Sequence, residues 1–175
     1  MEPDAAMPMP GDTGRQVILA ISDLAHEVAA VQAALSAHYL VVTAADAATG
    51  LQRVKAEPAP VLVLLATALP GGCLAVCREI KASPAVADIP LVLLGAGMSP
   101  DEDEAALALG VVDIVSWPLS APVWRARVRR YLASADQAAW LAEAVQRRTE
   151  EIQSIQEVTI MVLASLAETR DVDTC

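Results

Sequence analysis

Five short apolar runs, each followed by a segment with helical spacing, constrain the fold of this chain most strongly. The runs are Val17–Ile21, Tyr39–Thr43, Val61–Leu65, Leu91–Leu94 and Val111–Val115. Apolar runs of this length are typical of strands that are buried on both faces of a parallel sheet. The intervening segments have the length and spacing of crossover helices. The pattern therefore predicts an α/β fold with a doubly wound, five-stranded parallel sheet over residues 15–134.

The last third of the chain has a different pattern. No Gly or Pro occurs after Pro122 as far as Arg170, which predicts one helix of about 48 residues, roughly 70 Å long. Apolar residues recur at alternating spacings of three and four from Ala138, forming a heptad seam that is weakened at Arg148 and Thr159. Because such a stripe needs a partner, we expect residues 135–170 to form a signalling helix that makes a parallel homodimer. The alternative is an amphipathic helix that folds back on its own domain, with a break near residues 134–137.

The expected dimer contacts include two aromatic residues before the seam, which follow Trp117 at seven-residue steps. The complete set is Trp124, Tyr131, Leu141, Val145, Ile152, Ile155, Val162 and Leu166.

Composition limits the classes of partner. The chain has 12 Lys+Arg against 22 Asp+Glu, a net charge of −10, so we expect no nucleic-acid partner, since phosphate binding needs basic surface.

No apolar run approaches the roughly 18 residues of a membrane span. Residues 1–14 lack the regions of a signal peptide and are expected to be a disordered leader, with 171–175 as a tail. The odd set of three cysteines predicts no disulfide framework and, with the other features, a cytoplasmic protein.

Several segments carry a resemblance to the receiver domain of response regulators over about residues 16–134: VILAISDL, PVLVLLATALPGGCLAVCREIKAS, IPLVLLGAG and LGVVDIVSWPLS. The resemblance implies the flavodoxin-like receiver fold. It also implies a phosphorylation site in which an Asp after the third strand accepts the phosphoryl group. An acidic pair after the first strand helps that Asp to hold Mg²⁺, and a hydroxyl residue and a Lys bind the transferred group.

The residues at those positions differ from the family pattern. Ala66 stands at the phosphoacceptor position, Ser22 and Asp23 at the acidic pair, Gly95 at the hydroxyl position and Trp117 at the Lys position. One carboxylate is too few for Mg²⁺ binding. The resemblance therefore implies a degenerate receiver, a pseudo-receiver, with no catalytic residue, no metal and no cofactor.

The segment EIQSIQEVTIMVLASLAETRD at 151–171 resembles the linker helix that leads into HD-GYP domains, which hydrolyse cyclic di-GMP. The chain stops before the histidines of that family, so this resemblance predicts a non-enzymatic chain whose output domain is missing. Together the patterns predict a regulatory and dimerisation module of a two-component or cyclic di-GMP signalling protein. It would transmit its signal through the last helix, and a signalling partner protein is a further expected contact. The alternative function is a domain that senses a small molecule or a partner protein through the crevice at the strand ends.

Overall fold

The computed structural model describes residues 15–95, 97–118 and 120–171, and at 139, 151, 154, 158 and 162–171 it describes only the helical backbone. The chain divides into two compact units, Met1–Ala135 and Asp136–Cys175. The expected leader at 1–14, most of the expected tail, and the side chains of Val162 and Leu166 lie outside the described residues.

The first unit contains one parallel sheet with the strand order β2-β1-β3-β4-β5, as the apolar runs predict. Within the described residues, four helices connect the strands, and a fifth follows β5. The elements, in chain order, are β1 (Val17–Ile21), α1 (Ala25–Leu35), β2 (Leu40–Ala44), α2 (Ala47–Val54), β3 (Leu62–Ala66), α3 (Cys73–Ala82), β4 (Leu91–Leu94), α4 (Pro100–Ala108), β5 (Asp113–Val115) and α5 (Ala121–Asp171).

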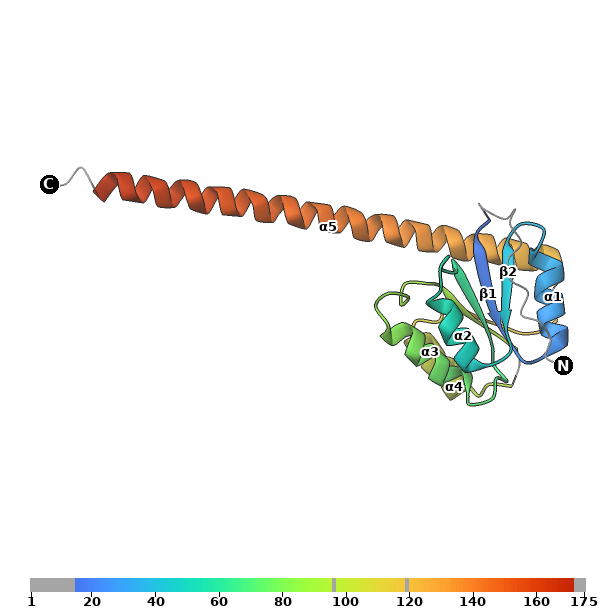
Figure 1. The fold of residues 1–175 in the computed structure, drawn as a ribbon. Helices are drawn as coiled ribbons and strands as arrows, with labels where there is room; N and C mark the ends of the chain where they lie inside the picture. Colours follow the sequence, from blue (N-terminus) through green and yellow to red (C-terminus); the bar gives the residue numbers. More distant parts are fainter. Residues whose placement is uncertain (1–14, 96, 119, 172–175) are drawn as a thin grey trace. The chain divides into compact units, whose positions relative to one another are not determined.

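Alternate strand residues pack into two separate apolar cores, one on each face of the sheet. Leu19 and Ile21 of β1 face the core that α2, α3 and α4 cover. Ile18 and Ala20 face the other core, which α1 and the first turns of α5 cover (Figure 1). Both faces are covered, so each central strand is apolar throughout, and this explains the uninterrupted runs in the sequence.

Helices α2 and α4 begin at side-chain caps. The Asp46 carboxylate accepts hydrogen bonds from the backbone N–H and the hydroxyl of Thr49 at the start of α2. Ser99 and Glu102 form a reciprocal capping box at the start of α4, where Pro100 occupies the first turn. These bonds satisfy N–H groups that have no partner within the helix.

Helix α5 is continuous over 51 residues, from Ala121 to Asp171. Strand β5 begins at Asp113, two residues later than the predicted start at Val111. At the start of α1, Leu24 is the N-cap and makes no side-chain cap bond. Ser22, two residues earlier, makes a contact that is described below.

Candidate functional site at the carboxyl ends of the strands

The predicted site residues lie where four parallel strands end. Ser22 follows β1, Ala66 is the last residue of β3, Gly95 follows β4, and Trp117 comes two residues after β5. Strand β2 lies on one side of β1 and β3 lies on the other, so the sheet grows in opposite directions from β1. In open α/β sheets this is the place where ligands bind.

Ala66 occupies the centre of this edge and offers only a methyl group. It pairs with Leu94 of β4 and is fully buried. An alkyl side chain can neither attack a phosphoryl group nor ligate a cation. Asp23, the one carboxylate at the predicted acidic pair, is exposed.

Ser22 is held by a buried carboxylate that sequence reasoning missed. Its hydroxyl donates a hydrogen bond to Glu27 Oε2 at 2.7 Å and accepts one from the backbone N–H of Leu24 at 3.1 Å. Both Ser22 and Glu27 are buried, at 6% and 5% exposure. The pair ties the end of β1 to the first turn of α1, so the Ser22 hydroxyl is already engaged.

The Thr67 side chain lies against Gly95. A β-carbon built on Gly95 would overlap Thr67 Oγ1, and the Gly95 backbone has a φ of +136°, which side-chain-bearing residues rarely adopt. The backbone N–H of Thr67 donates to the Leu94 carbonyl at 2.7 Å, which fixes the two strand ends in register. The position that matches the receiver hydroxyl is therefore filled by a neighbouring threonine.

Trp117 contributes to the core on the α1 and α5 side of the sheet. It is half-buried, and its ring centroid lies 5.7 Å from that of Trp124, with the ring planes tilted by 50°. Among the described residues neither indole N–H has a hydrogen-bond partner, although both are buried. A packed indole thus replaces the cation that the receiver pattern has at this position.

The assignment of Trp124 and Tyr131 to a dimer interface is wrong. Their exposed fractions are 1% and 2%, because both pack in the core of their own domain. The Tyr131 hydroxyl donates to Asp113 Oδ2 at 2.6 Å, and Arg127 forms an ion pair with the same oxygen. Burial, together with the hydrogen bond to Asp113, raises the pKa of Tyr131. The seven-residue steps reflect intramolecular packing.

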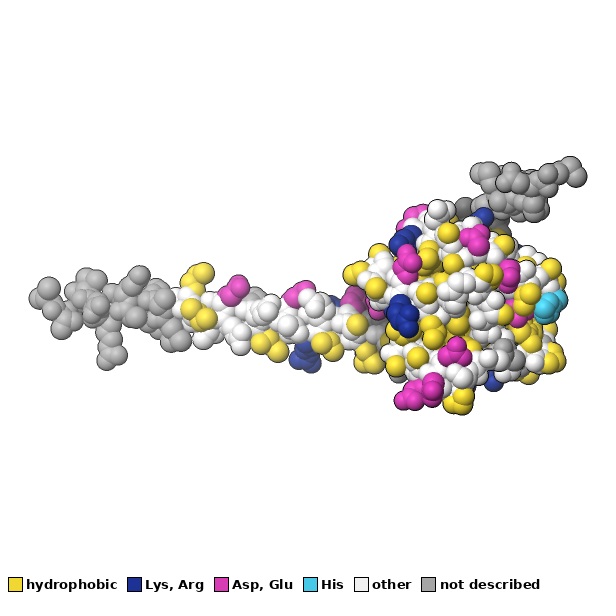
Figure 2. Space-filling model, turned by 90° about the horizontal axis from the view of Figure 1, so that it is seen from below, with side chains coloured by type: hydrophobic (Ala, Val, Ile, Leu, Met, Phe, Trp, Pro, Cys, Tyr) yellow, Lys and Arg dark blue, Asp and Glu magenta, His cyan; other side chains and the backbone are white. Residues whose placement is uncertain are grey.

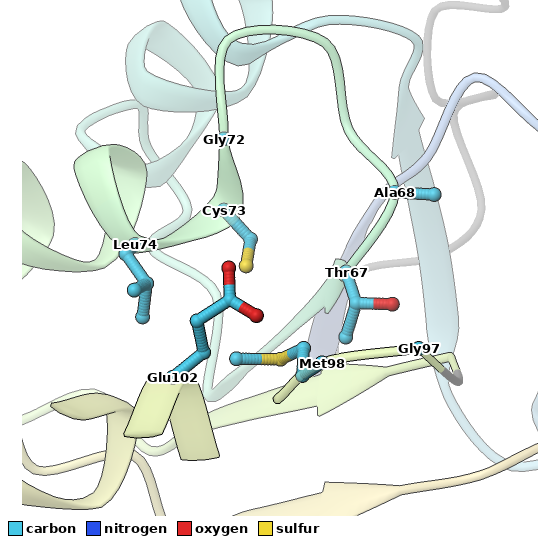
Figure 3. Close-up of a pocket in the computed structure, with 8 residues that line it drawn as sticks. All are labelled: Thr67, Ala68, Gly72, Cys73, Leu74, Gly97, Met98 and Glu102. Atoms are coloured by element: carbon cyan, nitrogen blue, oxygen red, sulfur yellow. The ribbon is translucent and has the colours of Figure 1, made fainter. Parts of the chain in front are cut away.

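A cavity of about 290 Å³ lies beside Thr67, between the loops that follow β3 and β4 (Figure 3). Leu74 and Met98 supply apolar wall, and Glu102 points its carboxylate toward Cys73. Burial raises the pKa of Cys73, and it raises that of Cys77 to about 12. Both thiols are free and buried, as expected for small core residues. The cavity is lined by Thr67, Ala68, Gly72, Cys73, Leu74, Gly97, Met98 and Glu102.

The residues at the strand ends do not fit Mg²⁺. This hard cation needs several oxygen ligands, whereas the strand ends supply an alanine, a glycine, the exposed carboxylate of Asp23, and a serine that is engaged with the buried Glu27 carboxylate. Within the described part of the chain, no three His, Cys, Asp or Glu residues gather as a metal site.

No protein-family model matches the chain. The chain is homologous to a Vibrio cholerae protein named "Probable cyclic di-GMP phosphodiesterase", with 30% identity over 93% of this chain. It is also homologous to response regulator PleD of Caulobacter vibrioides, with 33% identity over 64% of the chain. It spans 38% of the length of the first relative and 25% of the second.

Solved structures identify the fold. NtrX from Brucella abortus superposes with a TM-score of 0.65 at 26% identity, over 73% of this chain and 29% of that one. The signal receiver domain of an HD domain-containing protein from Pseudomonas fluorescens superposes with a TM-score of 0.65 at 20% identity, over 76% of this chain and 98% of that one. The globular unit has the response-regulator receiver fold. No described helix of the chain combines the length and the hydropathy of a membrane span.

Proposed function

We propose that this receiver-fold domain is a regulatory and dimerisation module that is not phosphorylated. It acts in a two-component or cyclic di-GMP signalling protein and passes a change of geometry through α5 to an output domain. The observation that carries the proposal is Ala66, the buried methyl group at the phosphoacceptor position. The engaged Ser22 and the Thr67 side chain, which fills the space beside Gly95, add to it, because they occupy the places that the phosphorylation chemistry needs.

The homologues support the signalling context. The match to the Vibrio cholerae protein covers 93% of this chain and so extends well beyond the globular unit into α5. That protein is named a probable cyclic di-GMP phosphodiesterase, and this chain covers 38% of its length. We infer that α5 connects the receiver-fold domain to such an output.

The described part of the heptad seam supports dimerisation. Val145, Ile152 and Ile155 have exposed fractions of 65%, 56% and 64%. Figure 2 shows hydrophobic side chains exposed along the described part of this helix. Three successive heptads of the seam each have an acidic residue five positions after their first residue, on the opposite face of the helix. These residues are Glu143, Glu150 and Glu157. A helix with one apolar and one acidic face is suited to pairing with a second copy.

Phosphorylation is tested by incubating the full chain with acetyl phosphate and Mg²⁺ and measuring its intact mass. We expect no added phosphoryl group under conditions that label a receiver with its aspartate intact. An acid-labile phosphoryl adduct on this chain would contradict the proposal, and peptide mapping would then locate the acceptor.

Dimerisation is tested by sedimentation equilibrium on the full chain. The Ile152→Gln/Ile155→Gln variant removes two seam residues, and Ile160→Gln/Met161→Gln is the matched control, because Ile160 and Met161 are equally exposed but lie off the seam. We expect a dimer that the seam variant weakens at least about tenfold and the control leaves intact. A monomeric parent chain, or equal effects of both variants, would rule out the seam as the interface.

The cavity beside Thr67 favours a second function, the sensing of a small molecule. Its volume of about 290 Å³ is close to the lower end of the usual size of ligand pockets. A thermal-shift screen of small metabolites tests this function. A genuine ligand should lose its effect in Leu74→Trp, which fills the cavity, and keep it in Ala75→Trp, on an exposed neighbouring position.

A further inference from the structure

Four arginines occur within six residues at the start of α5, and the structure separates them into two pairs. Arg127 and Arg130 lie beside Asp113, with Arg130 also over the Tyr131 ring at 5.5 Å. Their charge is thus partly compensated. Arg125 and Arg129 are spaced i, i+4 and share another face of the helix. Among the described residues, neither of these two guanidinium groups has a hydrogen-bond or ion-pair partner.

Arg125 and Arg129 line a second cavity, of about 380 Å³, together with Gln16, His38 and Tyr39. Gln16 immediately precedes β1, and His38 and Tyr39 immediately precede β2. The cavity therefore lies at the amino ends of these strands, at the opposite end of the sheet from the degenerate phosphorylation site. A ligand here would not contact that site.

Among the described residues that line this basic pocket, every side chain offers a hydrogen-bond donor and none is a carboxylate. Each lining residue carries at least one N–H or O–H group: an amide, an imidazole, a phenol and two guanidinium groups. In a chain with a net charge of −10, such a concentration of cationic groups is unusual. One guanidinium group can bind two oxygens of a phosphate through two parallel hydrogen bonds, so arginine is well suited to a phosphorylated ligand.

The nearby end of α1 does not account for the two arginines. Basic side chains often lie near a helix C-terminus, where they bond to unpaired carbonyl groups. Here Arg15 has that role, since its Nη2 donates to the Ala37 carbonyl at 3.0 Å. Arg125 and Arg129 make no such bond within the described chain.

We propose that the pocket formed by Gln16, His38, Tyr39, Arg125 and Arg129 binds a small phosphorylated molecule. The volume of about 380 Å³ exceeds what a single phosphate ion fills and lies within the usual range for small-molecule sites. The Tyr39 ring supplies an apolar surface for the body of the ligand, and the two arginines bind its phosphate groups.

The test is isothermal titration calorimetry of the full chain at roughly 150 mM salt, where weak surface attraction is screened. Inorganic pyrophosphate probes the anion alone, and ADP probes an anion with an organic body. We expect saturable binding of pyrophosphate and tighter binding of ADP. Arg125→Gln/Arg129→Gln should weaken both at least about tenfold. Lys55→Gln/Arg78→Gln removes the same charge from exposed sites elsewhere and should have little effect.

Two results would overturn the proposal: no saturable binding of either probe, or equal losses in the two variants. If the arginine variant does not fold, backbone NMR of the unchanged chain replaces it. Pyrophosphate should then shift the amide signals of residues 16, 38, 39, 125 and 129 before those of α2 and α3. Shifts that are spread over all basic residues would equally refute a defined site.

Discussion

Thr67 Oγ1 occupies the space that a β-carbon on Gly95 would need, across the neighbouring ends of β3 and β4. The two positions depend on each other. Because a hydroxyl side chain at 95 would meet this threonine and also strain the backbone, restoring the receiver pattern takes more than one substitution.

Replacing Gly95 tests this relationship. Gly95→Ser should lower the free energy of unfolding by about 1–3 kcal/mol through backbone strain at positive φ, and by more through the overlap with Thr67. Adding Thr67→Ala to the Gly95→Ser chain should recover only the free energy that is lost through the overlap. Urea denaturation of the parent chain, the two single variants and the double variant measures this recovery as a coupling energy.

Gly97 provides the matched control for this cycle. It also has a positive φ, of +97°, but an added β-carbon there meets nothing within 4 Å. Gly97→Ser should therefore show the strain without any coupling to Thr67. Independent, additive effects of Gly95→Ser and Thr67→Ala would show that the overlap is relieved without cost.

Trp124 is predicted to stabilise the domain rather than an interface. Trp124→Ala should lower the free energy of unfolding by about 3–5 kcal/mol, the usual cost of removing a buried aromatic ring. Trp140→Ala removes the same side chain where it is 62% exposed, and should cost no more than about 0.5 kcal/mol. Chemical denaturation followed by circular dichroism distinguishes the two. A Trp124 variant that keeps its stability but loses self-association would restore the interface assignment.

The buried thiols predict low reactivity. Burial raises the pKa of Cys77 to about 12, and it also raises that of Cys73, so both stay protonated and unreactive near neutral pH. In a Cys175→Ser background, Ellman's reagent should modify neither thiol until the protein unfolds. Rapid reaction of two thiols in the native chain would contradict this.

The same pKa shift predicts a loss of stability in alkali. The folded state keeps the Cys77 proton, which the unfolded state releases from about its ordinary pKa of 9.0. This contribution is complete below pH 9 and disappears as the pH rises toward about 12. Unfolding free energies measured across this range should fall less steeply in Cys77→Ala. Identical slopes would mean that this thiol does not contribute.

The sheet was predictable because β1, β3 and β4 are buried on both faces, which leaves an uninterrupted apolar run in each. The burial of Trp124 was not predictable, since a seven-residue step fits a core stripe as well as an interface. Its burial in the core cluster that contains Ile18 and Val92 decides between the two.

Two contacts at the candidate site depend on geometry that no local pattern contains. Ser22 and Glu27 are five residues apart and bond across the junction of a strand and a helix. Thr67 and Gly95 meet because Ala66 pairs with Leu94, and this register is known only once the sheet is built.

The helix caps predict the behaviour of the domain in acid. Hydrogen bonds from Thr49 lower the pKa of Asp46, and bonds from Ser99 lower that of Glu102. Each carboxylate therefore stabilises the folded state above its ordinary pKa, of 3.8 and 4.5 respectively, and this contribution is lost as the pH falls through the lowered value. Asp46→Asn and Glu102→Gln should each flatten the acid limb of the unfolding free energy. Glu104→Gln, an exposed α4 residue outside the capping box, should leave that limb unchanged. A cap variant with the slope of the parent chain would show that its carboxylate has the same pKa in the folded and unfolded states.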